Sequence, residues 1–215
     1  MKKNLTKIAM GLGLCIALVA CSKDEETIVV PVTAITVKDL PADTVTGLGI
    51  DGRPQSANTT TYFSLVDNKV IASTDVATTK WDIAFSSTKI LINGGTSGPG
   101  IGGAFVYVGL FDALKTIPAD SNFATDNANA ASFAIPLGSG RAWYTYDGLT
   151  TLVSPIAGRV LVIRTATGKF AKIEILNYYK GGVTLPATAS VNDKLFKQRY
   201  YTFRYVYQPN GSKTF

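Results

Sequence analysis

The sequence predicts an all-β protein: a single-domain, mostly antiparallel and sandwich-like fold with long loops. Three observations lead to this class. Short stretches rich in Val, Ile and Thr recur along the chain, and turn signals separate them. The 20 glycines and 10% aromatic residues are typical of β domains. The 46% hydrophobic and 17% charged residues supply a core and exclude a disordered chain, and 215 residues fit one domain plus a targeting segment.

The strands expected from this pattern follow one another along the chain. The first is expected at a sheet edge, because Pro31 interrupts it and proline cannot donate to a sheet ladder. Segments 39–56, 116–134 and 180–190 have loop composition, and 111–115 suits one helical turn. The expected strands are Ile28–Val37, Thr60–Val66, Lys69–Ser73, Lys80–Phe85, Lys89–Ile92, Ala104–Val108, Ala142–Tyr146, Arg159–Thr165, Lys169–Tyr179 and Tyr200–Tyr207.

Two of these strands show a two-residue alternation that assigns side chains to faces. The clearest hairpin joins Arg159–Thr165 to Lys169–Tyr179, and the last strand carries four aromatic residues on one face. The expected faces are Phe170, Lys172 and Glu174 opposite Ala171, Ile173 and Ile175, and, in the last strand, Tyr201, Phe203, Tyr205 and Tyr207 together.

The first 20 residues have the features of a bacterial signal peptide. Lysines at the start precede an apolar stretch, Ile8–Ala20, that is too short to span a bilayer comfortably. Leu18–Cys21 matches the lipobox of bacterial lipoproteins, in which small residues precede the cysteine that receives the lipid. We therefore expect residues 1–20 to be removed and Cys21 to be lipidated.

Residues 21–27 are expected to form the lipidated cysteine and an acidic tether to the domain, residues 28–215. The tether, Ser22–Glu26, resembles a surface-export signal of some Gram-negative anaerobes, although a plain solvated linker is the alternative. The resemblance implies an outer-membrane protein, lipid-anchored, whose domain faces the cell exterior. The exported chain carries 18 Lys and Arg against 15 acidic residues, which gives no case for nucleic-acid binding.

Missing residue types exclude several kinds of chemistry. The chain has no histidine, and both methionines and Cys15 lie in the segment that is removed. Histidine-based triads, zincin motifs and Cys/His zinc sites are therefore impossible. Glu174 is the only glutamate outside the tether. We expect a binding protein and not an enzyme.

The Gly-rich segment 93–103 is the most unusual motif of the domain. It lacks the Gly-Lys-Ser/Thr ending of a Walker loop, and the segment after it is β-rich, unlike a dinucleotide fingerprint. Two interpretations remain open: a long flexible loop, or a pocket rim where backbone approaches a flat ligand.

Several stretches resemble the HmuY family: Thr79–Phe85, Asn93–Tyr107, Trp143–Tyr146, Leu161–Lys172 with Tyr178 and Tyr179, and Tyr200–Tyr205. The resemblance covers most of the exported chain. It implies a cell-surface β-protein that grasps haem between loops and passes it to an outer-membrane, energy-coupled receptor for iron acquisition. The family's best-known members hold the iron with two histidines, and some relatives use methionine; this chain can use neither.

Tyrosine is then the first remaining protein ligand for ferric haem iron, followed by lysine or carboxylate. Tyr144 and Tyr146 are the leading candidates as axial ligands, because they follow the long loop, share one face of a short strand and lie near Arg141. Tyr107, after the Gly-rich segment, is third. Arg141 and Lys115 are candidates to pair the haem propionates.

Three other functions stay open. The scaffold could bind another porphyrin or an iron chelate, which the missing His and Met residues favour. It could be a surface adhesin or structural lipoprotein without a small-molecule site. A hydrolase is the weakest alternative, given the missing His and Cys residues.

Overall fold

The computed structural model describes residues 32–128 and 132–215, which form antiparallel β-sheets with one short α-helix. The predicted all-β class and sandwich-like architecture are confirmed. The predicted signal peptide, Cys21 and the tether lie outside the described residues. Within the described ranges, no helix is long and apolar enough to cross a membrane.

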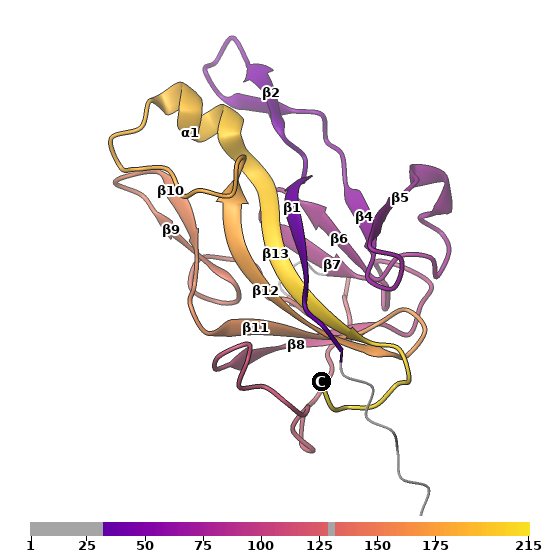
Figure 1. The fold of residues 1–215 in the computed structure, drawn as a ribbon. Coiled ribbons are helices and arrows are strands. Elements are labelled where there is room, and N and C mark those ends of the chain that lie inside the picture. Colours follow the sequence, from indigo (N-terminus) through magenta and orange to yellow (C-terminus); the bar gives the residue numbers. More distant parts are fainter. Residues whose placement is uncertain (1–31, 129–131) are drawn as a thin grey trace, which may run out of the picture. The chain divides into compact units, whose positions relative to one another are not determined.

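The larger sheet has five antiparallel strands in the order β1-β13-β12-β11-β8 (Figure 1). Its edge strand β1 begins at Ile35, so the predicted edge position is correct, and the expected start at residue 28 falls outside the described residues. The clearest predicted hairpin is present as β11 and β12. The strands are β1 Ile35–Pro41, β8 Gly103–Val108, β11 Arg159–Arg164, β12 Phe170–Tyr179 and β13 Gln198–Gln208.

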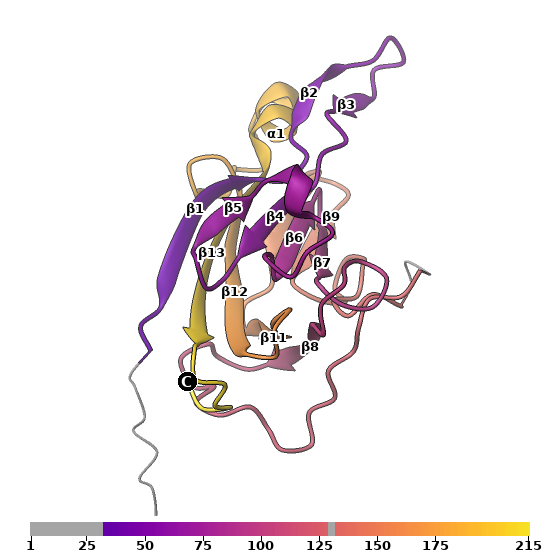
Figure 2. The same cartoon turned by 90° about the vertical axis from the view of Figure 1, so that its right-hand side faces the viewer.

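The second sheet has four strands in the order β5-β4-β6-β7 and lies against one face of the first (Figures 1 and 2). Asp67 and Asn68 lie in the turn that joins β4 to β5, with Asn68 in the left-handed region at φ 51°. A 3-10 turn, Ser73–Asp75, follows β5, where the sequence predicted more strand. The strands are β4 Thr61–Ser64, β5 Lys69–Ile71, β6 Ile83–Ser86 and β7 Lys89–Ile92.

Two small hairpins and the helix complete the described residues. β9 Tyr144–Asp147 pairs with β10 Leu152–Pro155, and β2 Val45–Leu48 pairs with β3 Pro54–Ser56. The second hairpin lies inside the segment 39–56 that was predicted as loop. The helix α1, Val191–Lys197, contacts β2 and was not predicted at all (Figure 2).

Aromatic side chains fill the space between the two large sheets. From β13, Tyr201, Phe203 and Tyr205 are fully buried there, as the alternation predicted. Phe203 packs against Phe63 of β4 and Phe85 of β6, with ring centroids 5.7 and 5.5 Å apart. Burying rings of this size supplies most of the hydrophobic stabilisation of a small β-domain.

Residues 81–85 do not alternate in burial, unlike a strand with one buried face, because both faces of this segment are covered. Ile83 and Phe85 face the large core, whereas Trp81 and Ala84 belong to a separate cluster with Ile71. The strand itself begins only at Ile83, since Trp81 and Asp82 precede β6.

The outer face of the five-stranded sheet carries a second cluster, beneath segment 109–125 and the C-terminal tail. Phe170 packs there and Lys172 is buried there, opposite Ala171 and Ile173, which confirms the predicted faces of β12. The Lys172 ammonium donates hydrogen bonds to the carbonyls of Phe111 (2.9 Å) and Leu114 (2.7 Å). Two backbone carbonyls of the predicted helical turn at 111–115 are therefore satisfied by a buried lysine of β12.

The Gly-rich segment 93–103 packs on itself and on neighbouring parts of the chain, such as Asp126 and Ala166. Buried Asn93 donates from Nδ2 to the carbonyls of Thr78 and Trp81 and accepts from the Gly100 N–H at 2.9 Å. A Cβ at Gly102 would collide with the Asn93 carbonyl oxygen, and one at Gly94 would collide with that of Gly102. The glycines are thus required for close approach of the chain to itself, which neither sequence interpretation anticipated.

Candidate binding site

Burial divides the tyrosines of the chain into those that could reach a ligand and those that could not. Burial raises the pKa of Tyr179, Tyr201 and Tyr178, and raises the pKa of Tyr205 to about 12. Three of these hydroxyls already take part in hydrogen bonds within the protein. Tyr201 and Tyr205 donate to backbone carbonyls, and Tyr179 accepts from the Val153 N–H at 2.9 Å. Such phenols resist ionisation, so they are poor candidates for a metal ligand.

Tyr146 is the exposed member of the predicted leading pair. It lies in β9, pairs with Val153 of β10, and the residue is 51% exposed. Tyr144, at the start of β9, is only 8% exposed, and its ring packs 4.8 Å from that of Trp143. The two residues share a strand, but only Tyr146 presents its phenol to solvent.

Hydrogen bonds within its own turn stabilise the β9–β10 hairpin. The Asp147 carboxylate accepts from the Thr150 hydroxyl at 2.7 Å and from the Leu149 N–H at 2.9 Å. These two bonds, the hydroxyl first, lower the pKa of Asp147. The turn leaves Leu149 98% exposed at its tip. The hydrogen bond from Val153 to Tyr179 ties the hairpin to β12.

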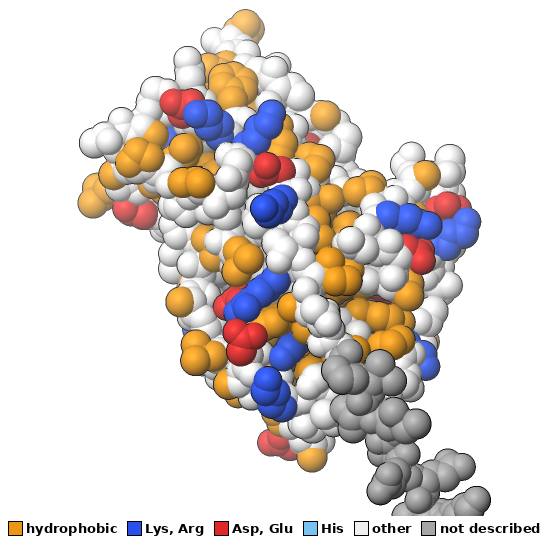
Figure 3. Space-filling view, in the orientation of Figure 1, with side chains coloured by type: hydrophobic (Ala, Val, Ile, Leu, Met, Phe, Trp, Pro, Cys, Tyr) orange, Lys and Arg blue, Asp and Glu red, His pale blue; other side chains and the backbone are white. Residues whose placement is uncertain are grey.

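Tyr146 opens onto a hollow of about 310 Å³ between this hairpin and α1. We call it the Tyr146 pocket. Its volume lies at the lower end of the range for small-molecule sites, roughly 300 to 1,000 Å³. Figure 3 shows hydrophobic side chains at the surface around α1, where Val191 is 71% exposed. The lining residues are Tyr146, Thr151, Val191, Lys194, Leu195 and Gln198.

The helix that supplies the second wall is short and has no buried residue. Ser190 caps it by accepting from the Asp193 N–H at 3.0 Å, and Asp193 pairs with Lys197 at 2.8 Å. The preceding loop is joined to the helix by Lys194, whose ammonium donates to the Ala187 carbonyl at 2.7 Å. Val191, Lys194 and Leu195 were missed by the sequence reasoning, although Ser190 followed by Asp193 is a recognisable start signal.

Arg141 belongs to the same region as the tyrosine pair. It is exposed in the turn 138–141, which bonds directly to β9. The Tyr146 N–H donates to Ser139 Oγ at 2.8 Å, and the Gly140 N–H donates to the Tyr144 carbonyl at 2.8 Å. Three of the predicted residues, Tyr144, Tyr146 and Arg141, are therefore brought together.

Tyr107 and Lys115 lie elsewhere, on the outer face of the five-stranded sheet. Tyr107 packs against the cluster of Phe111 and Val160, and a Cβ at Gly109 would lie 2.5 Å from its ring. Lys115 is exposed, and its carbonyl accepts from the Phe215 N–H at 2.7 Å. These two residues cannot share a compact site with Tyr146, because the sheet separates their cluster from the core against which Tyr144 packs.

The Tyr146 pocket combines a phenol and an ammonium group with apolar walls. This suits a ligand with a flat apolar body, an oxophilic metal or hydrogen-bond acceptor, and an acidic edge. In the described ranges, no group of three or more acidic or cysteine side chains could hold a metal ion by itself.

Solved structures resemble the chain at low sequence identity. A protein from Bacteroides fragilis, assigned as a lipoprotein, aligns over 82% of this chain and 91% of its own with a TM-score of 0.52 and 16% identity. This likeness supports the fold. A protein from Bacteroides vulgatus described as an HmuY-like heme-binding protein covers 81% and 91% of the two chains with a TM-score of 0.47 and 13% identity. Apo PinO from Porphyromonas gingivitis covers 83% and 97% with a TM-score of 0.43 and 16% identity.

Sequence comparison with curated proteins gives no match. The model of the family described as HmuY protein, in contrast, matches residues 56–190, which is more than half of the chain. The matched range includes most of the resembling stretches found in the sequence, and it carries the β9–β10 hairpin with Tyr146. The chain belongs to the HmuY family.

Proposed function

We propose that this protein binds ferric haem, or a related tetrapyrrole, at the Tyr146 pocket, with the Tyr146 phenol as the iron ligand. The observation that carries the proposal is an exposed tyrosine in an apolar hollow beside a lysine, in a member of the HmuY family. Tyrosine is an established axial ligand of haem iron. The family's histidine ligands have no counterpart here, because the chain has no histidine.

The chemistry of capture follows from the residues of the pocket and from Leu149 and Arg141, which lie in adjoining turns outside its lining. A phenol must lose its proton to bind iron, and the ferric ion supplies the charge that makes this loss favourable. Val191, Leu195 and the exposed Leu149 offer apolar contact to the porphyrin face. Lys194 and Arg141 supply positive charge for the propionates, each worth little alone at a solvated surface.

The proposal gives no direct contact with haem to the other predicted residues Tyr144, Lys115 and Tyr107. Tyr144 supports the strand that presents Tyr146, through its contact with Trp143. Lys115 and Tyr107 would serve only a ligand bound on the outer sheet face, which the described structure fills with side chains of segment 109–125.

The same proposal places the protein at the outer membrane, anchored by a lipid on Cys21 and facing the cell exterior. It would act as a carrier and not as an enzyme, delivering haem to an energy-coupled outer-membrane receptor. The partly open pocket supports this role, because a ligand that stays partly exposed is accessible to a receiving protein.

A titration of the purified protein with ferric haem tests the proposal. We expect a saturable one-to-one change in the visible spectrum with high-spin, phenolate-type bands. Dithionite should weaken binding, because an anionic oxygen ligand favours ferric over ferrous iron. Gallium(III) protoporphyrin, which dithionite leaves trivalent, is the control and should stay bound. If micromolar protein gives no saturable change, haem is not the ligand, and other porphyrins and iron chelates become the candidates.

A further inference from the structure

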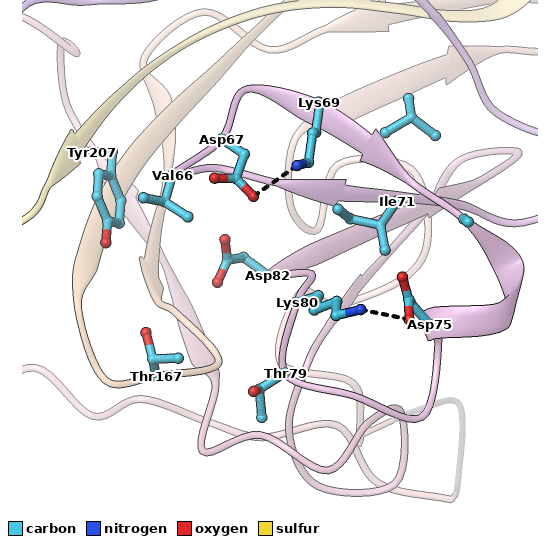
Figure 4. Close-up of a pocket in the computed structure, with 12 residues that line it drawn as sticks. Val66, Asp67, Lys69, Ile71, Asp75, Thr79, Lys80, Asp82, Thr167 and Tyr207 are labelled. Carbon is cyan, nitrogen blue, oxygen red and sulfur yellow. Dashed lines mark hydrogen bonds and ion pairs between the residues drawn. The ribbon is translucent and has the colours of Figure 1, made fainter.

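A second and larger hollow, of about 450 Å³, lies at the other sheet, around Asp82. We call it the Asp82 pocket (Figure 4). It contains none of the residues of the Tyr146 pocket, so an inference about it does not depend on haem binding. Its lining consists of Val66, Asp67, Lys69, Val70, Ile71, Ala72, Asp75, Thr79, Lys80, Asp82, Thr167 and Tyr207.

The charges of this pocket do not balance. Lys69 pairs with Asp67 at 3.4 Å, and Lys80 pairs with Asp75 at 2.9 Å. Within the part of the chain that the structure describes, Asp82 has no ion-pair partner. Two lysines and three carboxylates therefore leave one negative charge, on the most buried of the acids.

Asp82 is held as an acceptor at the base of the pocket. The residue is 5% exposed, and its carboxylate accepts from the Leu65 N–H at 2.8 Å and from the Ala166 N–H at 3.1 Å. Burial raises the pKa of Asp82, whereas the two N–H donors favour its ionised form. A carboxylate has about four lone-pair sites, so these two bonds leave capacity for a further donor.

Two neutral oxygens lie on the same side of the pocket as Asp82. Figure 4 shows the hydroxyl groups of Tyr207 and Thr167 bordering the space next to Asp82, with Asp67 of the Lys69–Asp67 pair beside it and the Lys80–Asp75 pair farther away. Burial, and then the charges of Asp82 and Asp67, raise the pKa of Tyr207, so its phenol stays protonated and neutral. An ammonium group has three N–H donors, and Asp82, Thr167 and Tyr207 together offer it three oxygen acceptors.

The remaining walls are apolar. Val66, Val70, Ile71 and Ala72 line the pocket, and the Tyr207 ring adds an aromatic surface. Alkyl carbons fit such walls, and a cation is attracted to an aromatic face. We infer that the Asp82 pocket binds a primary ammonium group carried on a short alkyl chain, with Asp82, Thr167 and Tyr207 as its acceptors.

Binding of n-butylammonium, followed by amide chemical shifts of the full protein, tests this inference. We expect saturable shifts confined to the residues of the Asp82 pocket, and binding at least about tenfold weaker for n-butanol, which has a similar shape and no charge. Nα-acetyl-lysine amide distinguishes the source of the group: binding extends the site to lysine side chains of peptides, and rejection restricts it to free amines. Equal binding of n-butanol, or the absence of saturable shifts, would overturn the inference.

Variants test the three acceptors. Asp82→Asn should abolish n-butylammonium binding, whereas Asp112→Asn, an exposed acid on the other face of the five-stranded sheet, should not change it. Because Asp82 also accepts two backbone hydrogen bonds, its variant could fail to fold. The double variant Thr167→Val with Tyr207→Phe keeps the shape of the pocket and should bind at least about tenfold more weakly. Unchanged affinity in that variant would show that the pocket is not the site.

Discussion

Replacing Tyr146 with phenylalanine is expected to weaken ferric haem binding by at least about tenfold, or about 1.4 kcal/mol. The change removes the one phenol oxygen that the Tyr146 pocket presents to a ligand and keeps the ring. Any haem that remains bound should lose the phenolate bands, because no other lining residue can supply them. Titration of both proteins with ferric haem, followed in the visible spectrum, measures the difference.

Tyr107→Phe is the matched control for this prediction. Tyr107 also lies in a β-strand and is partly exposed, but it packs on the outer face of the five-stranded sheet. Its variant should bind haem as the unmodified protein does. If Tyr107→Phe weakens binding and Tyr146→Phe does not, the ligand lies on the outer face, and the assignment of the pocket is wrong.

Replacing Lys172 with alanine is expected to lower the free energy of unfolding by about 2 to 4 kcal/mol. The ammonium is the donor to two buried carbonyls, of Phe111 and Leu114, and lies 4.6 and 5.2 Å from the ring centroids of Phe111 and Phe215. Buried acceptors left without a donor cost about 1 to 3 kcal/mol each, and a lost cation–π contact about 1 kcal/mol. Relief of a buried charge offsets part of this loss. Urea unfolding measures the change.

Two further variants test whether the loss of stability is specific to Lys172 and how much of it comes from lost side-chain volume. Lys115→Ala removes a nearby exposed lysine and should change stability by about 0.5 kcal/mol or less. Lys172→Met keeps most of the side-chain volume and should destabilise less than alanine. If Lys172→Ala unfolds at the same urea concentration as the unmodified protein, the lysine does not hold segment 109–125 to the sheet.

Lys172 also predicts a pH dependence. Burial, and then the charge of Lys115, lower the pKa of Lys172 below its ordinary value near 10.5. The folded chain therefore holds this proton less tightly than the unfolded chain. The cost of the buried charge is fully present below the lowered pKa and is relieved as pH rises from there to about 10.5. The stability of the unmodified protein relative to Lys172→Met should accordingly rise with pH in that window.

Alternation along the strands was enough to predict most of the scaffold. The β11–β12 hairpin and the inward faces of β12 and β13 follow from runs such as Ala171-Lys172-Ile173 and Tyr201-Thr202-Phe203, because one face meets the core and the other does not. Burial does not alternate where this asymmetry disappears. At residues 81–85 both faces are buried, so polarity no longer reports the direction of a side chain.

Short elements held by contacts far along the chain were harder to predict. The helix α1 has seven residues, none of them buried, so it is too short to show a long helical pattern of buried apolar positions. The β2–β3 hairpin lies in a segment rich in turn residues, and Asp43 connects it to Arg199 of β13 at 3.4 Å. No local pattern contains that ion pair, since its partners are more than 150 positions apart.

The residues of the candidate site also fall into those that could be predicted from sequence and those that could not. Tyr144, Tyr146 and Arg141 could be grouped from sequence because they are neighbours along the chain. Lys194 and Val191 could not, because α1 reaches the Tyr146 pocket only through the fold. Tyr107 was a candidate because it follows the Gly-rich segment, and Lys115 because of its charge; the five-stranded sheet separates both from Tyr146.

The central claim is that ferric haem binds at Tyr146, and paramagnetic broadening tests it most directly. Amide spectra of the protein with one equivalent of ferric haem would be compared with spectra containing the diamagnetic gallium(III) analogue. We predict that broadening centres on Tyr146, Val191 and Lys194 and spares Tyr107 and Lys115. Broadening centred on the outer sheet face, or no specific broadening at all, would contradict the claim.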